Sequence, residues 1–282
     1  MRTYFNWSTG KDSALALHYL LQEKSYNVEH LVTSMNAYYD RVSMHGLRRE
    51  LYKQQVDALG ISYSTIELSE QPSMAEYERI MKDTVSDLQG KGFECSAFGD
   101  IFLEDLRVYR ERQLATFNIK GIFPLWKKNT RDLLNEFIEL GFKAILVCIK
   151  SDLLDASFAG RIIDNDFIKD LPSNVDPCGE NGEFHTFCFD GPIFKNRVDF
   201  ILGEKTYREY KSPQIKEDSC FTIPEKDSVG FWFCDILPGS ASLKLSSSPP
   251  EAMLSSKPAK NCPQPLKGPP PKISTPDQRP SS

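Results

Sequence analysis

Residues 4 to 13 read Tyr-Phe-Asn-Trp-Ser-Thr-Gly-Lys-Asp-Ser. The apolar first half predicts a short buried strand, and the small polar residues after it predict a turn that leads directly into a helix. Such a turn gathers free backbone N–H groups and the positive end of the helix dipole at one point, where an anionic phosphate binds. We therefore predict a phosphate-binding turn in which Lys11 supplies a point charge; it consists of Ser8, Thr9, Gly10, Lys11, Asp12 and Ser13.

The order of residues in this turn differs from that of a P-loop NTPase. A P-loop needs a glycine about five residues before the glycine that precedes the lysine, and a Ser or Thr directly after the lysine. Phe5 stands at the first of these positions, and Asp12 follows Lys11. A simpler interpretation stays open, in which a chance run of small polar residues caps a helix.

The composition indicates a globular, acidic body. The chain of 282 residues is 40% apolar and 11% aromatic, which suits a packed core. Its net charge is −5, but residues 1–238 carry 28 Lys and Arg against 37 Asp and Glu. An acidic body argues against a broad nucleic-acid-binding surface.

The cysteines and the hydropathy pattern predict a cytoplasmic protein. The seven cysteines include no Cys-x-x-Cys pair, and an odd number without a signal peptide is typical of reduced thiols. No apolar run approaches the roughly 18 residues of a membrane-spanning helix. We therefore expect no membrane contact.

Short apolar strands alternate with amphipathic helices from residue 2 to about 150, which predicts an α/β fold with a parallel sheet covered on both faces. We expect a Rossmann-like, doubly wound sheet in residues 1–150, with Lys11 at the carboxyl end of its first strand, where such sheets bind ligands. The expected strands are 3–7, 30–36, 62–67, 95–98, 121–123 and 144–149, and the expected helices are 13–23, 47–59, 74–89, 105–117 and 129–140.

The alternation fades after residue 150. We predict a smaller α+β region on the substrate side in residues 151–238, with strands at 197–203 and 219–237. Eleven of the eighteen prolines fall at or after Pro238, among frequent serines. Such a segment cannot bury enough apolar area to offset the entropy of ordering it, so we predict that residues 239–282 are disordered.

A second polar cluster occupies residues 176–192, Asp-Pro-Cys-Gly-Glu-Asn-Gly-Glu-Phe-His-Thr-Phe-Cys-Phe-Asp-Gly-Pro. Acids, a histidine and a threonine between glycines are typical of a functional loop. In an extended chain Glu183 and His185 face the same side, and a carboxylate beside an imidazole can orient a metal, relay a proton or hold a polar substrate. A surface turn with solvated side chains is the alternative.

Both clusters resemble motifs of one family. The turn at residues 8–13 is similar to the SGGKDS loop of the N-type ATP pyrophosphatases, which cleave ATP between the α- and β-phosphates. Gly-Glu-Asn-Gly-Glu-Phe-His-Thr at residues 179–186 resembles the GE-N/G-GE-Y/F-HT signature of the diphthine–ammonia ligase family, whose members pair it with that loop. The resemblance covers roughly residues 3–237, with further matches at Met44-His45-Gly46, at Gly99-Asp100-Ile101 followed by Arg107, Arg110 and Glu111, and at Pro124-Leu125-Trp126.

The resemblance implies a PP-loop fold of the HUP type that binds ATP and Mg²⁺. Residues 8–13 would hold the ATP phosphates, and Asp12 would position Mg²⁺ or the loop. Thr9 departs from the family pattern, because a glycine-like backbone with positive φ would be strained there unless Gly10 alone supplies the flexible point.

The resemblance also implies a substrate side. Glu183, His185 and Thr186, with Gly182, would lie across the cleft and face an acceptor carboxylate or ammonia, so that Lys11, Glu183 and His185 are the expected catalytic residues. Asp100 follows the fourth strand and would bind substrate or metal, or serve only as a turn residue. His45 would reach the adenosine or cap its helix.

The implied reaction is carboxylate activation by ATP, followed by attack of ammonia. In eukaryotic and archaeal members the implied acceptor is diphthine, a modified histidine on elongation factor two, whereas bacterial relatives would use another acceptor. A tRNA-thiolating PP-loop enzyme would need persulfide-forming cysteines and a basic surface, and a glutamine-dependent amidotransferase would need a glutaminase domain. Two alternatives stay open: a nucleotide-binding module without catalysis, and a PP-loop enzyme that acts on a different small-molecule or RNA acceptor. The sequence also leaves open whether the chain forms a homodimer.

Overall fold

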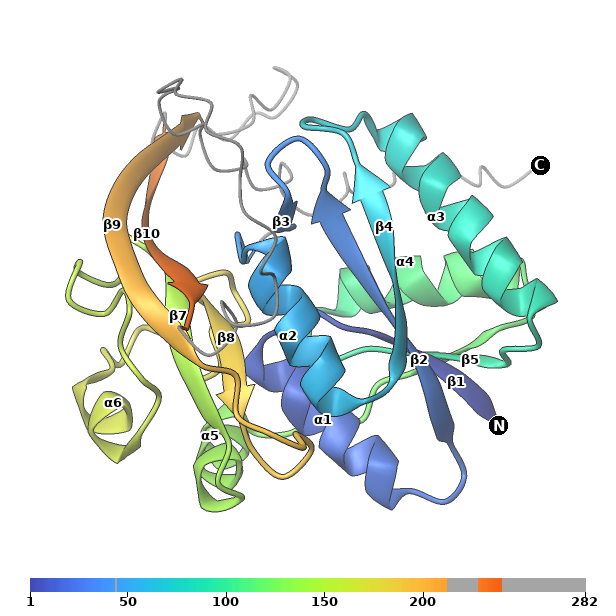
Figure 1. The fold of residues 1–282 in the computed structure, drawn as a ribbon, viewed down its shortest axis with the longest axis horizontal. Coiled ribbons are helices and arrows are strands. Elements are labelled where there is room, and N and C mark those ends of the chain that lie inside the picture. Colours follow the sequence, from blue (N-terminus) through green and yellow to red (C-terminus); the bar gives the residue numbers. More distant parts are fainter. Residues whose placement is uncertain (44, 212–227, 240–282) are drawn as a thin grey trace, which may run out of the picture.

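A computed structural model describes residues 1–43, 45–211 and 228–239, which form two sheets with helices around and between them (Figure 1). The first sheet has the strand order β4-β2-β1-β5-β6, with all neighbours parallel. Its strands are β1 (Arg2–Asn6), β2 (Asn27–Asn36), β4 (Ser62–Leu68), β5 (Cys95–Ala97) and β6 (Lys120–Ile122).

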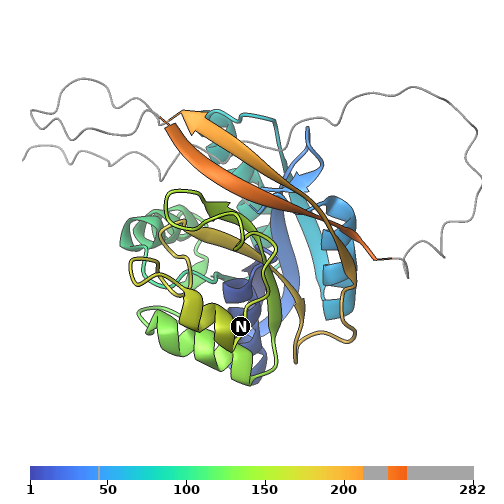
Figure 2. The same cartoon turned by 90° about the vertical axis from the view of Figure 1, so that its left-hand side faces the viewer.

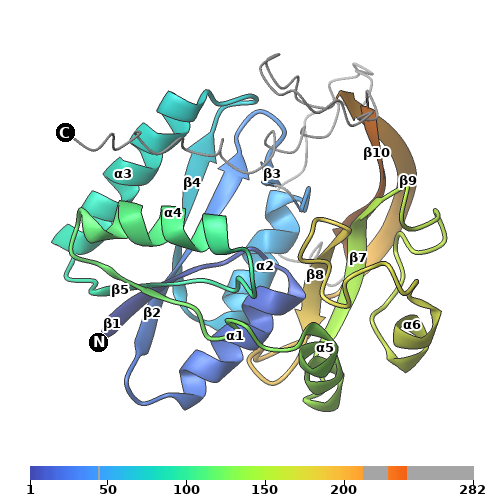
Figure 3. The same ribbon diagram turned by 180° about the vertical axis from the view of Figure 1, so that it is seen from behind.

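Four helices cover the two faces of this sheet. Helices α1 (Lys11–Gln22) and α2 (Arg49–Leu59) pack on the face toward the second sheet, and α3 (Met74–Gly90) and α4 (Glu104–Ala115) pack on the opposite face (Figures 1 and 3). Successive side chains of a strand alternate between faces, so Tyr4 joins the core under α3 and α4 while Phe5 joins the core under α1 and α2. The predicted α/β fold with a doubly wound parallel sheet is confirmed.

The second sheet is antiparallel, with the order β8-β7-β10-β9. It consists of β7 (Lys143–Lys150), β8 (Phe184–Asp190), β9 (Phe200–Lys211) and β10 (Ser228–Pro238), and the last two form a long curved ribbon (Figure 2). Helix α5 (Thr130–Glu139) and the short α6 (Asn165–Asp170) lie on its side of the molecule.

The strand predicted at 144–149 exists, but its expected place in the parallel sheet is wrong. As β7 it pairs only with antiparallel neighbours, β8 and β10. Its run of apolar residues is buried throughout, and a strand buried on both faces has the same sequence pattern in either kind of sheet. The strand predicted at 197–203 starts at Phe200 and continues to Lys211, and residues 219–227 lie outside the described chain.

The short strand β3 (Arg41–Val42) pairs antiparallel with Met35 and Asn36 at the end of β2. β4 pairs with one edge of β2 along most of its length. β3 therefore pairs with the opposite edge of β2, beyond the residues of β2 that pair with β1. The segment after β3 therefore lies directly beyond the end of β1, over the turn that begins at Ser8.

The predicted disorder of the C-terminal tail concerns residues 240–282, which lie outside the described part of the chain. Within the described residues, no helix has the length and apolar character needed to cross a bilayer.

Candidate functional site

The turn between β1 and α1 has the predicted strand-turn-helix layout. Gly10 is the N-cap of α1, and the Ser8 N–H donates to Ser13 Oγ over 3.2 Å. Gly10 has an ordinary φ of −88°, but a Cβ at this position would lie 2.8 Å from His45 Cε1. Glycine is therefore required here because the segment after β3 approaches so closely, not because of its backbone angle.

Thr9 carries the unusual backbone of the turn. Its φ is +76°, and the residue is fully buried. This left-handed conformation is unfavourable for a β-branched residue and persists only where the surroundings enforce it. Its carbonyl oxygen accepts from Cys188 N over 2.9 Å and from Gln55 Nε2 over 3.0 Å, so contacts from β8 and α2 hold the strained peptide.

A pair of substitutions at Thr9 tests this strain. We expect Thr9→Gly to be more stable than Thr9→Ala by about 1 kcal/mol, because glycine alone adopts positive φ without a steric penalty. Urea denaturation of both variants measures the difference. At Thr65, in the middle of β4, we expect the usual order, with alanine more stable; the same order at Thr9 would contradict the assigned backbone.

Lys11 is almost completely buried, 3% exposed. Its Nζ donates to both carboxylate oxygens of Asp12, over 2.8 and 2.7 Å, and to the Cys178 carbonyl oxygen. Burial is the largest single influence on the pKa of Lys11 and would lower it, but the charge and hydrogen bonds of Asp12, together with nearby Cys178 and Glu180, outweigh burial and raise that pKa above its ordinary value. Lys11 is therefore a fixed positive charge at the start of α1.

The start of β8 meets this turn. The backbone N–H of Lys11, one of the first donors of α1, donates to Thr186 Oγ1 over 3.0 Å. The structure thus brings together two segments 175 residues apart in the sequence, and the predicted residues Lys11 and Thr186 are in direct contact.

Glu183 and Gly182 shape the loop before β8. The buried Glu183 carboxylate accepts from Asp176 N over 3.1 Å, from Asn181 N over 2.9 Å and from Asn181 Nδ2 over 3.0 Å. Gly182, between Asn181 and Glu183, has a φ of +80°. The carboxylate of Glu183 therefore holds its own loop in shape.

His185 and His45 form a pair of neutral imidazoles, with ring centroids 5.0 Å apart. Burial lowers the pKa of His45 to about 4 and the pKa of His185 to about 3. His45 Nδ1 lies 2.9 Å from the Thr186 carbonyl oxygen, so the neutral ring donates from Nδ1 and has Nε2 as an acceptor. His45 was a minor candidate in the sequence, and the structure places its ring against the turn.

Two acids lie at the end of β5. Glu180 Oε2 accepts from Ile101 N over 3.2 Å, and burial, with the nearby Asp12 charge, raises the pKa of Glu180 to about 7. Asp100 forms an ion pair with Arg110, at 3.0 Å between Oδ2 and Nε. Asp100 therefore has a structural partner, and its predicted substrate contact stays a prediction.

The raised pKa of Glu180 predicts a pH dependence of stability. Between about pH 4.5 and 7 the native state holds a proton that the unfolded chain has lost, so the free energy of unfolding should decrease as pH rises, by at most about 3 kcal/mol. The groups that face Glu180 are Asp12, Lys11, Asp100 and the Ile101 N–H. Urea denaturation at pH 5 and 7.5 should show this decrease in the wild type and a smaller one in Glu180→Gln; equal decreases would contradict the assignment.

The site fits Mg²⁺ only together with a nucleotide. Within residues 1–43, 45–211 and 228–239 no group of three or more His, Cys, Asp or Glu side chains could hold a metal. Mg²⁺ in phosphate-transfer sites takes one or two protein carboxylates and completes its shell with phosphates and water. Asp12, at the start of α1 beside the turn, would supply one carboxylate, and it would have to share with Mg²⁺ the oxygens that now accept from Lys11 Nζ.

Gln55 is a buried polar residue that the sequence reasoning missed. Its Oε1 accepts from Trp7 Nε1 over 2.8 Å, and its Nε2 donates to the carbonyl oxygens of Thr9 and Cys188, over 3.0 and 2.6 Å. One amide thus joins β1, the turn and β8. The signal was present, because Gln55 is the single polar member of an otherwise apolar buried stripe on α2, with Leu51, Tyr52, Val56 and Leu59.

The doubly wound parallel sheet and the polar turn between β1 and α1 define a Rossmann-like α/β protein with its candidate site at the carboxyl end of β1. The family model described as the diphthamide synthase N-terminal domain matches residues 1–119, and the one described as the diphthamide synthase C-terminal domain matches residues 129–218. The chain belongs to the diphthamide synthase family.

Individual relatives agree with this family. The diphthine–ammonia ligase of Bos taurus is 26% identical over 170 residues, which cover 58% of this chain and 61% of that protein. The ligase of Rattus norvegicus is 28% identical, covering 57% and 64%, and that of Schizosaccharomyces pombe is 25% identical, covering 58% and 27%. The chain thus spans less than two thirds of the length of these relatives.

A solved structure, the U34-tRNA thiolase NcsA from Methanococcus maripaludis with its [4Fe-4S] cluster, is 17% identical, with a TM-score of 0.29. The match covers 50% of this chain and 58% of the thiolase chain. A structural similarity this weak supports no inference about function.

Proposed function

We propose that the protein is an ATP-dependent ligase that converts a carboxylate to an amide with ammonia. Its relatives named diphthine–ammonia ligase support the joining of ammonia to an acceptor. The contact of Lys11 N with Thr186 Oγ1 carries this proposal, because it joins the phosphate-binding turn to the second motif. Carboxylate activation needs an ATP phosphate site and an acceptor site side by side.

The reaction has two steps. An acceptor carboxylate oxygen attacks the α-phosphorus of ATP, the bond to the β-phosphate breaks, and pyrophosphate leaves. The nitrogen of ammonia then attacks the acyl carbon, AMP leaves with the bridging oxygen, and the nitrogen loses one proton. Lys11 and the N–H groups at the start of α1 offset the charge that grows on the phosphates, and Mg²⁺ held in part by Asp12 would neutralise the leaving pyrophosphate.

The residues on the β8 side have separate parts in this proposal. The neutral His185 and His45 can each offer an imidazole nitrogen to ammonia or to the proton that it loses. Thr186 faces the turn, and Glu183 keeps the loop in place with Gly182. The division into a 1–150 nucleotide domain and a 151–238 substrate region, and a cytoplasmic location, stay part of the proposal.

The proposed acceptor is diphthine on elongation factor two, and a different carboxylate is the second candidate. A nucleotide-binding module without turnover is less favoured, because the neutral imidazole pair of His45 and His185 would then have no chemical task. The experiment is to incubate the protein with ATP, ¹⁵N-ammonium and diphthine-bearing elongation factor two. Mass spectrometry should find one ¹⁵N amide on the diphthine; ATP binding without any amide would support the non-catalytic alternative.

A further inference from the structure

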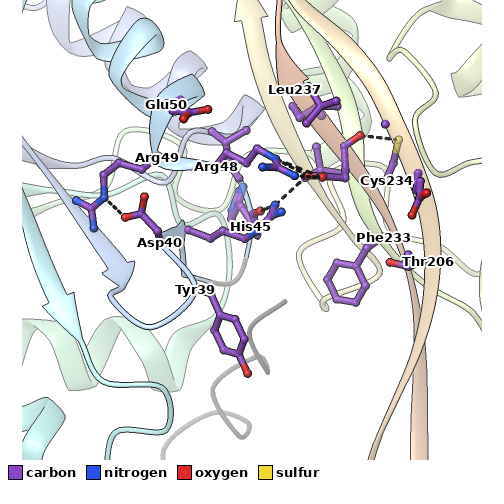
Figure 4. A pocket seen from close by; sticks show the side chains of 18 of the residues that line it. Tyr39, Asp40, His45, Arg48, Arg49, Glu50, Thr206, Phe233, Cys234 and Leu237 are labelled. Carbon is purple, nitrogen blue, oxygen red and sulfur yellow. Dashed lines mark hydrogen bonds and ion pairs between the residues drawn. The ribbon is translucent and has the colours of Figure 1, made fainter. Parts of the chain in front are cut away.

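A pocket of about 600 Å³ lies between the two sheets, outside the turn described above (Figure 4). One wall consists of residues 39–41 and 45–50, around β3 and the start of α2, and the other is the β9–β10 ribbon. A pocket of this size falls within the usual range for specific ligand sites.

The pocket adjoins the phosphate-binding turn through His45. This residue lines the pocket, while its ring lies against Gly10 and bonds the Thr186 carbonyl oxygen. A ligand in the pocket is therefore one imidazole ring away from Lys11 and the start of α1.

The half-buried part of the pocket is positively charged. Arg41 and Arg48 both form ion pairs with one carboxylate, Asp235 of β10, at 2.9 Å and 2.5 Å. Arginines outnumber acids among the half-buried lining residues, since Asp235 is the one acid of that kind. The side chains of Arg41 and Asp235 are 17% and 26% exposed. The other acidic lining residues, Asp40, Glu50 and Glu204, are exposed to solvent, where water screens their charge.

We propose that this pocket holds the carboxylate-bearing acceptor, with Arg41 and Arg48 as its anchoring groups, next to the nucleotide. The proposal rests on the proposed ligase function. Guanidinium groups favour carboxylates and phosphates because their planar forks donate in parallel pairs. In the proposed reaction the ATP phosphates bind at the turn on the other side of His45. The remaining anionic reactant is the acceptor carboxylate, and we therefore assign it to this pocket.

The variant Thr206→Trp fills the pocket from the β9 side without touching residues 8–13. Thr206 pairs with Phe233 of β10, and both line the pocket. The matched control is Lys205→Trp, because the next residue along a strand faces the opposite side. We expect Thr206→Trp to raise KM for diphthine-bearing elongation factor two by at least about tenfold through steric exclusion. The Kd of a non-hydrolysable ATP analogue should stay unchanged, and Lys205→Trp should alter neither constant.

A binding measurement separates this proposal from the ligase function. In an NMR titration with glutarate, a small dicarboxylate, the wild type should show saturable shifts at Gly203 and Thr206, and Arg48→Gln should weaken them about tenfold. Shifts without any amide formation would support the pocket and contradict the ligase. Amide formation without these shifts, or a raised Kd for the ATP analogue in Thr206→Trp, would overturn the pocket proposal; the latter would place the nucleoside there.

Discussion

Lys11→Ala is expected to lower kcat/KM for amide formation by about two to three powers of ten. This factor corresponds to about 3–4 kcal/mol of lost transition-state stabilisation, as is typical when one preorganised donor is removed. Lys11 is the buried cation at the start of α1, and charge grows on the phosphates as pyrophosphate leaves. A steady-state assay of pyrophosphate release measures the effect.

The control for this substitution is Lys24→Ala, on the exposed segment after α1, which should leave kcat/KM unchanged. Removal of Lys11 also leaves the Asp12 carboxylate without its two short contacts, so circular dichroism should accompany the assay to show that the variant is folded. A folded Lys11→Ala protein with undiminished pyrophosphate release would mean that the turn at residues 8–13 does not hold the reacting phosphates.

Gln55→Leu is expected to lower the free energy of unfolding by about 3 kcal/mol. Leucine is close to glutamine in size, but it leaves the buried Trp7 Nε1 and the Cys188 carbonyl oxygen without their present partner. Each unpaired buried polar group costs about 1–3 kcal/mol. Thr9 also loses one of the two donors that hold its strained peptide.

Urea denaturation measures this loss, and Gln54→Leu is the matched control. Gln54 is the neighbouring residue on α2 and is only half-buried, so its replacement should change the free energy of unfolding by less than about 0.5 kcal/mol. If Gln55→Leu were as stable as Gln54→Leu, the three hydrogen bonds of Gln55 would not be what joins β1, the turn and β8.

The elements of the parallel sheet could be predicted because their signals are local. β1, the polar turn and α1 follow one another within 22 residues, and each has its own pattern. The sheet that β7 joins could not be predicted from its own residues, since a fully buried strand looks alike in both sheets. The sequence predicts a loop where β8 lies, because the glycines and acids before Phe184 hide the start of the strand.

The part of the site that lies within compact sequence motifs could be predicted, because those signals are local too. Lys11 and Thr186 were found because each belongs to a compact motif. Gln55 and His45 act through residues far along the chain: Gln55 through Cys188, and His45 through Thr186. Nothing in the neighbouring sequence of either residue reveals these partners, and the positive φ of Thr9 likewise depends on contacts from β8 and α2.

Activation of a carboxylate by ATP determines which phosphorus compounds are formed, and ³¹P NMR distinguishes them. ³¹P NMR of the protein with ATP, Mg²⁺, ammonium and diphthine-bearing elongation factor two should show AMP and pyrophosphate forming in equal amounts. Omission of the elongation factor should abolish both signals. ADP and inorganic phosphate as the products would contradict cleavage between the α- and β-phosphates, and with it the assignment of the turn after β1.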